Sequence, residues 1–185
     1  MKLFAFAASH RKDSVNRKLV NIAVHMAKEQ EAHIDVVEYG AFDAPIYDDE
    51  TYADHVLPAS AQKFVNHLQE AQGIIIASPE YNWSFPGSLK NIIDWASVVS
   101  PNPFAGKTAL LLSASPSLRG GAQGLIQLRV PLEHLGMFVF PRIFALSRAE
   151  TAMNGDGAFN DAKLTGELTQ LVTEFCATTK ALGKA

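Results

Sequence analysis

Residues 73–96 of this 185-residue chain read GIIIASPEYNWSFPGSLKNIIDWA. The first five residues form a short apolar run without alternation, which is typical of a strand buried on both faces. Pro79 fixes its own φ and disfavours helical geometry at Ser78, so the chain leaves the strand on a stiff path. Pro86 and Gly87 then begin a helix with apolar residues at helical spacing. The stretch therefore predicts a strand, a rigid loop and a helix in succession.

This strand and helix alternation extends through the whole chain. Apolar runs of the same kind occur at residues 3–8, 34–39, 73–77, 108–113 and 137–146, and one-sided helical spacing occurs at 15–26, 64–71 and 164–175. We predict the α/β class, as a doubly wound five-stranded parallel sheet with helices on both faces. No repeat or linker divides the sequence, so residues 1–185 are expected to form a single domain. The longest irregular segment, residues 40–58, is predicted to be either a lid or interface arm, or a solvated acidic loop.

Composition narrows the class of protein. Hydrophobic residues make up 48% of the chain, charged residues 19%, and the net charge is −3, so bulk charge attracts neither nucleic acid nor an anionic membrane. The single cysteine, Cys176, excludes an intramolecular disulfide. We interpret the apolar N-terminus as the first strand and not as a signal peptide, and no run approaches the roughly 20 residues of a membrane span. A cytoplasmic location is expected.

Ligands of doubly wound sheets bind beyond the carboxyl ends of the strands, near the point where the strand order reverses. This rule selects three loops, at residues 9–16, 78–88 and 113–121. In the first loop, hydroxyls of Ser9 and Ser14, the amide of Asn16 and the Arg11 guanidinium can converge on one anion. The helix that starts at Val15 adds free N–H groups and the positive end of its dipole. Ser14 could instead only cap this helix, but a cap leaves Ser9 and Arg11 unexplained.

Absent motifs exclude several kinds of site. The first loop has no G-x-G-x-x-G, which disfavours a Rossmann dinucleotide clamp, and no cysteine precedes Arg11, which excludes a cysteine-nucleophile phosphatase. The six histidines show no metal-ligand spacing, so no metal site is predicted. The surviving interpretation of the first loop is a site that holds one terminal phosphate without cleaving it.

The second loop suits a flat ring. A rigid turn at the end of a strand can direct consecutive backbone N–H groups at the rim of a planar heterocycle. Three aromatic residues, Tyr81, Trp83 and Phe85, lie between two prolines, where they are expected to contact a ring or a partner subunit. In the third loop, Ser115 is the predicted ligand contact, and Gly120-Gly121 permits a close approach or a turn with φ > 0. An ordinary turn without a ligand is the alternative for this loop.

Two stretches of the sequence resemble the signatures of the NADPH-dependent FMN reductase family. They are Ser78-Pro79-Glu80-Tyr81-Asn82-x-Ser84-x-Pro86-Gly87-x-Leu89-Lys90-Asn91-x-Ile93-Asp94-Trp95-x-Ser97 and Ser9-x-Arg11-x-x-Ser14-x-Asn16. The resemblance covers essentially the whole domain and implies a flavodoxin-like fold that binds FMN. One departure is Ala8, where the family often has glycine. The implied cofactor-binding residues are Ser9, Arg11, Ser14, Val15 and Asn16 for the phosphate region, Pro79, Glu80, Tyr81 and Asn82 for the ring, and Ser115 beside it.

The resemblance also implies a function. NAD(P)H is the expected co-substrate, and a free flavin, a quinone or a similar small molecule is the expected electron acceptor. Since the flavin supplies the chemistry in such enzymes, no catalytic side chain is predicted. The family implies a homodimer or homotetramer in which the aromatic loop meets the partner. Two alternatives remain: a flavodoxin-type electron carrier, against which the mild charge and Arg11 count, and a non-catalytic flavin-binding interaction protein.

Overall fold

The computed structural model describes residues 1–50, 52, 55–155 and 157–183. Helices and strands alternate as the sequence predicts. The elements, in chain order, are β1 (Lys2–Ala7), α1 (Val15–Glu29), β2 (His33–Val36), the 3-10 helix η1 (Tyr39–Phe42), α2 (Ala59–Glu70), β3 (Gly73–Ala77), α3 (Gly87–Ser97), β4 (Thr108–Ala114), α4 (Ala122–His134), β5 (Phe138–Val139), β6 (Phe144–Leu146), α5 (Ala149–Ala152) and α6 (Ala162–Leu182).

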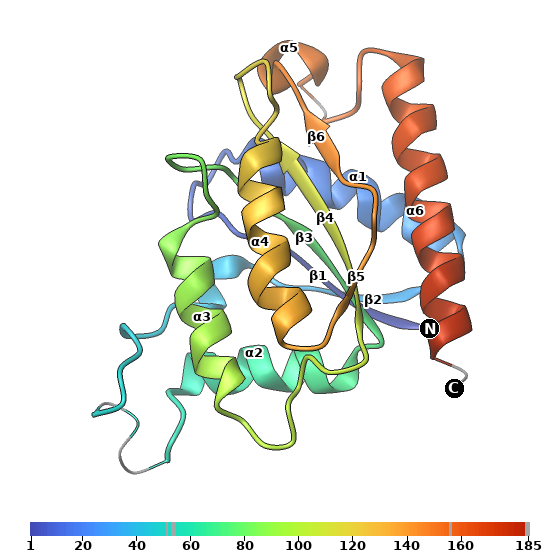
Figure 1. Ribbon diagram of the computed structural model, residues 1–185. Coiled ribbons are helices and arrows are strands. Elements are labelled where there is room, and N and C mark those ends of the chain that lie inside the picture. The colour runs from blue at the N-terminus through green and yellow to red at the C-terminus, as the bar shows by residue number, and fades with distance from the viewer. Residues whose placement is uncertain (51, 53–54, 156, 184–185) are drawn as a thin grey trace.

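All the strands belong to one parallel sheet (Figure 1). Its order is β2-β1-β3-β4, followed by β5 and β6, which both pair with β4 and share the fifth position. The order 2-1-3-4-5 is the flavodoxin-like one, and it places the switch point between β1 and β3. The predicted doubly wound α/β fold is therefore confirmed.

The predicted strand over residues 137–146 was wrong in one respect, because it is interrupted between β5 and β6. Pro141 lies in the interruption, and proline cannot donate a ladder hydrogen bond. The Arg129 guanidinium donates to the Phe140 carbonyl (2.8 Å), which the broken ladder leaves without a strand partner on that side. Similarly, the run at residues 34–39 is a strand only as far as Val36, because η1 begins at Tyr39.

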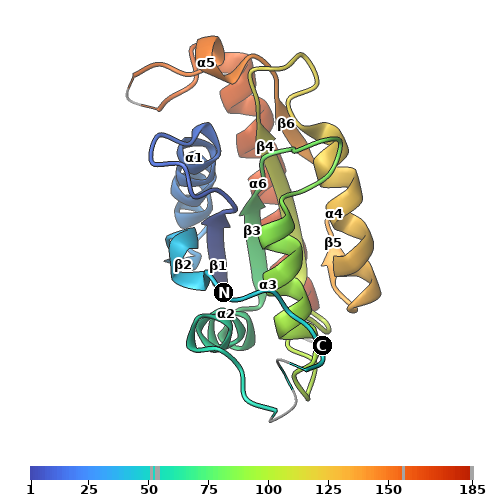
Figure 2. The ribbon, with the colours of Figure 1, turned by 90° about the vertical axis from the view of Figure 1, so that its left-hand side faces the viewer.

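Alternate residues of the strands face two separate hydrophobic clusters. Phe4 and Phe6 of β1 point into the cluster under α2, α3 and α4. Leu3 and Ala5 point into the cluster under α1 and α6. Figure 2 shows the sheet with α1 on one side and α3 and α4 on the other. Burial on both faces explains why the strand sequences lack alternation.

Part of the long loop at residues 40–58 is held against α3. The Asn91 amide donates to the carbonyls of Ala44 (3.1 Å) and Pro45 (2.9 Å), and the Trp95 indole donates to Pro45 (2.8 Å). Thr51, Ala53 and Asp54 of the predicted loop lie outside the described residues. The first part of this loop is thus fixed by side chains from α3, the helix that follows the second predicted ligand loop (residues 78–86, called the ring loop below).

Two further observations concern the reactivity of the single cysteine and the character of the helices. Cys176 is buried on α6, and burial raises the pKa of its thiol to about 11, so the thiol packs in the core and is not a nucleophile at neutral pH. Among the described residues, no helix combines the length and the apolar character needed to cross a membrane.

Candidate functional site

The loops after β1, β3 and β4 meet at the carboxyl edge of the sheet and enclose a cavity of about 110 Å³. In Figure 1 these loops lie near the upper ends of β1, β3 and β4. Of the predicted site residues, only Asn82 is absent from the lining. The lining consists of Ser9, Arg11, Ser14, Val15, Asn16, Pro79, Glu80, Tyr81, Ala114, Ser115 and Pro116. Parallel strands end at one edge of the sheet, which is why three loops distant in sequence converge here.

One end of the cavity has the chemistry of an anion site. Ser14 occupies the N-cap position of α1, but its side chain makes no cap hydrogen bond. The first-turn amides of Val15 and Asn16 have no acceptor within the described part of the chain. Arg11, whose backbone amide donates to the Ser9 hydroxyl (3.4 Å), lies in the same turn. Uncapped amides, a hydroxyl and a guanidinium therefore surround one point, which fits a phosphate group.

The Asn16 side chain has a structural role. Its amide nitrogen donates to the Ala114 carbonyl (3.0 Å), and its amide oxygen accepts from the Ala114 N–H (2.8 Å). The side chain is almost fully buried. It therefore replaces a neighbouring strand for the last residue of β4 and ties the start of α1 to the third loop. This buried pair of hydrogen bonds fixes the distance between the start of α1 and Ser115.

Ala8 does not disturb the first loop. Its N–H donates to the Ala77 carbonyl (2.9 Å), and its φ is not positive, so the conformation is open to any residue.

Tyr39 packs behind this loop, with its ring centroid 4.9 Å from that of His10, and its hydroxyl donates to the Ser88 hydroxyl (3.3 Å). Burial raises the pKa of Tyr39 to about 12, so the phenol stays neutral and links the first loop to the first turn of α3.

Glu80 anchors the ring loop to the next helix. Its carboxylate accepts from the Gly124 N–H (2.9 Å) in the first turn of α4. A carboxylate is favoured there because the first turn carries free N–H groups and the positive end of the dipole. A Cβ at position 124 would lie 3.2 Å from the Glu80 Cβ, so glycine permits the close approach. The acidic side chain therefore faces α4 and leaves the backbone of the loop free to face the cavity.

The ring loop ends in a tight hairpin turn. The Tyr81 and Ser84 backbones exchange two hydrogen bonds (2.8 and 3.1 Å), with Asn82 and Trp83 between them. Both central residues have positive φ, +50° and +67°, as a type I′ turn requires. Asparagine tolerates this conformation, whereas a tryptophan does so at a cost. Asn82 thus shapes the turn beside the cavity, and its predicted contact with the ring stays a prediction.

The three aromatic residues of this loop divide into two groups. Tyr81 and Trp83 are more than half exposed, at 53% and 56%. Phe85 instead packs against the hydrophobic cluster under α3 and α4, so it belongs to the core and not to the exposed set. The indole of Trp83 lies under the Arg119 guanidinium, whose central carbon is 4.4 Å from the ring centroid. The ring loop and the third loop are therefore in direct contact through these two side chains.

The third loop forms around two glycines with positive φ, Gly120 (+62°) and Gly121 (+87°), as predicted for this pair. Added Cβ atoms would meet the Ala145 carbonyl at position 120 and the Ser113 hydroxyl at position 121. Ser115 lines the cavity, and its hydroxyl accepts from the Ser117 N–H (3.2 Å). Ala114 and Pro116 also line the cavity and were not predicted, because neither has a side chain that signals a ligand.

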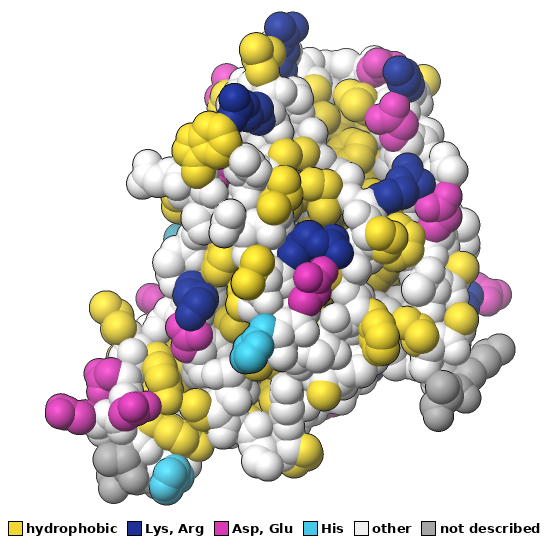
Figure 3. Space-filling model, viewed as in Figure 1, with side chains coloured by type: hydrophobic (Ala, Val, Ile, Leu, Met, Phe, Trp, Pro, Cys, Tyr) yellow, Lys and Arg dark blue, Asp and Glu magenta, His cyan; other side chains and the backbone are white. Residues whose placement is uncertain are grey.

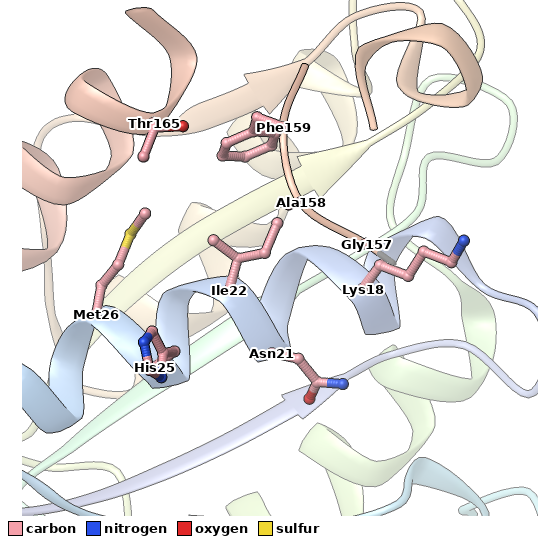
Figure 4. Close-up of a pocket in the computed structure, with 9 residues that line it drawn as sticks. All are labelled: Lys18, Asn21, Ile22, His25, Met26, Gly157, Ala158, Phe159 and Thr165. Atoms are coloured by element: carbon pink, nitrogen blue, oxygen red, sulfur yellow. The ribbon is translucent and has the colours of Figure 1, made fainter. Parts of the chain in front are cut away.

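Other hollows lie away from these loops. Figure 4 shows a groove of about 460 Å³ between α1 and residues 157–165, with Ile22, Met26 and Phe159 directed into it. None of the predicted residues line it. No cluster of histidine, cysteine or acidic side chains that could hold a metal occurs in the part of the chain that the structure describes.

Comparison with known proteins agrees with this geometry. Residues 1–151 match the family model described as NADPH-dependent FMN reductase. A quinone reductase of Escherichia coli is 38% identical over 52% of this chain and 52% of its own length. An NAD(P)H-dependent FMN reductase of Pseudomonas aeruginosa is 36% identical over 64% of each chain. The chain thus spans about half to two thirds of the length of these curated relatives.

A solved structure extends the similarity to nearly the whole chain. The flavoenzyme FerB of Paracoccus denitrificans, an NAD(P)H:(acceptor) oxidoreductase, is 29% identical and superposes with a TM-score of 0.84 over 97% of each chain. The family match covers β1 to the start of α5, and therefore all three loops that line the cavity. On this evidence the chain belongs to the NADPH-dependent FMN reductase family.

Proposed function

We propose that this protein is an NAD(P)H-dependent flavoenzyme that binds FMN at the carboxyl edge of the sheet and reduces a small-molecule acceptor such as a flavin or a quinone. The observation that carries the proposal is the convergence of Arg11, Ser14 and the free α1 amides at one end of a cavity whose other wall is the ring loop. The family match and the names of the relatives support the same activity.

The residues fit the two ends of FMN. The phosphate would be held by Ser9, Arg11, Ser14 and the first-turn amides, which offer several donors and a positive charge. The cavity of about 110 Å³ is too small for a whole flavin nucleotide, so the isoalloxazine would extend over the rim, along Pro79–Asn82. When bound, FMN would supply the redox chemistry by accepting a hydride from NAD(P)H and passing electrons to the acceptor.

The chain's own residues would position the ring and shield one side of it. The Glu80 carboxylate accepts from the Gly124 N–H of α4, and the Asn16 amide oxygen accepts from the Ala114 N–H of β4. These hydrogen bonds hold the ring loop and the first loop in place. The donors along the ring loop are backbone amides, which need no proton transfer of their own, so no catalytic side chain is assigned. We infer that the acceptor is a small molecule that stacks on the exposed side, and that the protein acts in the cytoplasm.

Replacing Arg11 with alanine is expected to raise the Kd for FMN about 10- to 100-fold, because charge-assisted hydrogen bonds to the phosphate are lost. The measurement is quenching of FMN fluorescence on titration into the apoprotein. Lys12→Ala removes an equal charge from the adjacent position, which does not line the cavity, and should change the Kd less than threefold. Equal affinity in wild type and Arg11→Ala would contradict the phosphate assignment.

The same preparation distinguishes the function classes. An enzyme should oxidise NAD(P)H over many turnovers with flavins or quinones as acceptors. An electron carrier would bind FMN but would not be reduced by NAD(P)H. A flavin-binding interaction protein would be reduced slowly and only once.

We further infer that the protein forms a homodimer or homotetramer through the outer face of α4. Ile126 and Val130, four residues apart on this helix, are exposed together with Phe138 of β5. Figure 3 shows apolar side chains on this face of the molecule, around a pair of oppositely charged side chains at its centre. Such a patch on a soluble chain usually marks an interface.

Val130→Lys is therefore expected to convert the oligomer to a monomer, as measured by light scattering after size-exclusion chromatography. Thr173→Lys places the same charge on an exposed site of α6, away from α4, and should leave the assembly intact. A wild type that is monomeric at micromolar concentration would refute the interface.

A further inference from the structure

The arginines of this protein fall into two spatial groups. Three of them pair with a carboxylate, at 2.8, 2.6 and 2.7 Å: Arg17 with Glu38, Arg129 with Glu133 and Arg142 with Glu174. The other three, Arg11, Arg119 and Arg148, have no carboxylate within 4.0 Å among the described residues. All three lie in segments at the carboxyl edge of the sheet. The arginines without an ion-pair partner among the described residues are thus carried by segments at this edge of the sheet.

Arg119 is held in place although it has no ion-pair partner. Its guanidinium lies over the Trp83 ring, 4.4 Å from the centroid. Stacking fixes the plane of a guanidinium and leaves the N–H groups at its edge available to an anion. Trp83 adopts φ +67°, which is costly for a bulky residue, and strain of this kind tends to be retained at functional sites.

Arg148 lies in a segment that is bound to the same loop. Its N–H donates to the Ser117 carbonyl (3.2 Å), and the Ala149 N–H donates to Ser115 (3.0 Å). The Ser147 hydroxyl donates to the Leu118 carbonyl (2.7 Å). Arg148 itself has φ +48°, and these three hydrogen bonds hold it there. The backbones that carry Arg119 and Arg148 therefore form one unit beside Ser115 and Pro116 of the cavity.

One terminal phosphate of FMN needs one such cation, and Arg11 is the one that lines the cavity. We propose that Arg119 and Arg148 form a second anion site on the outer rim, which binds the phosphate groups of the nicotinamide nucleotide. The inference rests on the proposed function and deepens it. The two substrates that would share the flavin face differ in charge, because the dinucleotide carries phosphates and a quinone carries none. A cationic rim would thus strengthen binding of the hydride donor without strengthening binding of a neutral acceptor.

The experiment compares three hydride donors on the FMN-loaded enzyme: NADPH, NADH and 1-benzyl-1,4-dihydronicotinamide, which has no phosphate. The variants are Arg119→Gln and Arg148→Asn, since asparagine tolerates positive φ. Arg142→Gln is the matched control, because this arginine is exposed and pairs with Glu174 on α6. Each rim variant is expected to lower kcat/KM about tenfold with the nucleotides, and the control to change nothing. The rate with the benzyl compound should be unchanged in all variants.

A loss with both nucleotides identifies the shared pyrophosphate as the bound group, and a loss with NADPH alone identifies the 2′-phosphate. Either result supports the second anion site. An equal loss with the benzyl compound, or no loss with either nucleotide, would overturn it. If the wild type does not bind FMN, both this inference and the proposed function fail. If the wild type is active and the rim variants are unaffected, only the second anion site is refuted.

Calorimetric titration of the oxidised, FMN-loaded protein with NADP⁺ gives a readout independent of turnover. The Kd should rise about tenfold in Arg119→Gln and should depend less on salt than in the wild type. Trp83→Gly removes the stacking platform at a position where glycine adopts φ > 0 without strain, so folding should be preserved. It should weaken NADP⁺ binding in the same direction, and unchanged binding would overturn the role of the stack.

Discussion

Asn16→Leu is expected to lower the free energy of unfolding by about 3 kcal/mol and to weaken FMN binding strongly. The substitution keeps the size of the side chain but removes both of its hydrogen bonds to Ala114. It leaves a buried N–H and a buried carbonyl without partners, at about 1–3 kcal/mol each. The start of α1 and the end of β4 would then be free to separate, which moves the anion site away from Ser115.

The change in stability is measured by urea unfolding followed by circular dichroism, and FMN affinity by fluorescence quenching. Asn21→Leu is a matched control, because Asn21 is exposed on the same helix, and it should alter stability by less than about 0.5 kcal/mol. If Asn16→Leu were as stable as this control, the hydrogen bonds between Asn16 and Ala114 would contribute nothing to the free energy of unfolding.

Gly121→Ala should destabilise the protein by about 3 kcal/mol. At φ +87° an L-residue is strained by about 1–2 kcal/mol. In addition, the new Cβ would overlap the Ser113 hydroxyl and lie 3.1 Å from its Cβ, and overpacking of this kind costs about 1–3 kcal/mol. Gly166→Ala, at an exposed position within α6 with no atom within 4 Å of the added Cβ, should instead raise stability by about 0.5–1 kcal/mol.

A double-mutant cycle separates the cost of the backbone conformation at position 121 from the cost of the overlap with Ser113. The Ser113 hydroxyl is buried and has no hydrogen-bond partner in the described part of the chain, so Ser113→Ala alone should be neutral or stabilising. Combined with Gly121→Ala, it should recover about 1–2 kcal/mol and leave the cost of the backbone conformation. It should not rescue Gly120→Ala, whose Cβ would lie 2.5 Å from the Ala145 carbonyl. Additive effects of Ser113→Ala and Gly121→Ala would contradict the overlap.

The position of most candidate-site residues could be predicted because the pattern that selects them is local. The anion loop combines Ser9, Arg11 and Ser14 within six residues, directly before a helix whose free amides are a property of any helix start. The rigid path after β3 follows from Pro79 alone. All the predicted residues except Asn82 line one cavity. The prediction failed where local pattern was ambiguous, as for Phe85, which is apolar and between two prolines but packs inward.

The roles of individual side chains could not be predicted in the same way. Asn16 lines the cavity as predicted, but no pattern in the sequence indicated that its amide binds a residue 98 positions away. Glu80 binds a backbone N–H 44 positions away, and Trp83 stacks on Arg119 from another loop. Each partner depends on strand order and on how the helices pack on the sheet, and no local pattern in the sequence encodes them.

The sequence by itself therefore determined the α/β alternation, the burial of the sheet on both faces and the edge at which a ligand would bind. These properties follow from apolar periodicity and from the common direction of parallel strands, both of which operate over a few residues. Only the tertiary structure decided the split of the last strand into β5 and β6, the tie between Asn16 and Ala114, and the stacking of Arg119 on Trp83. The physical reason is that these contacts depend on the register of the whole sheet, which is set by many weak packing terms summed over distant parts of the chain.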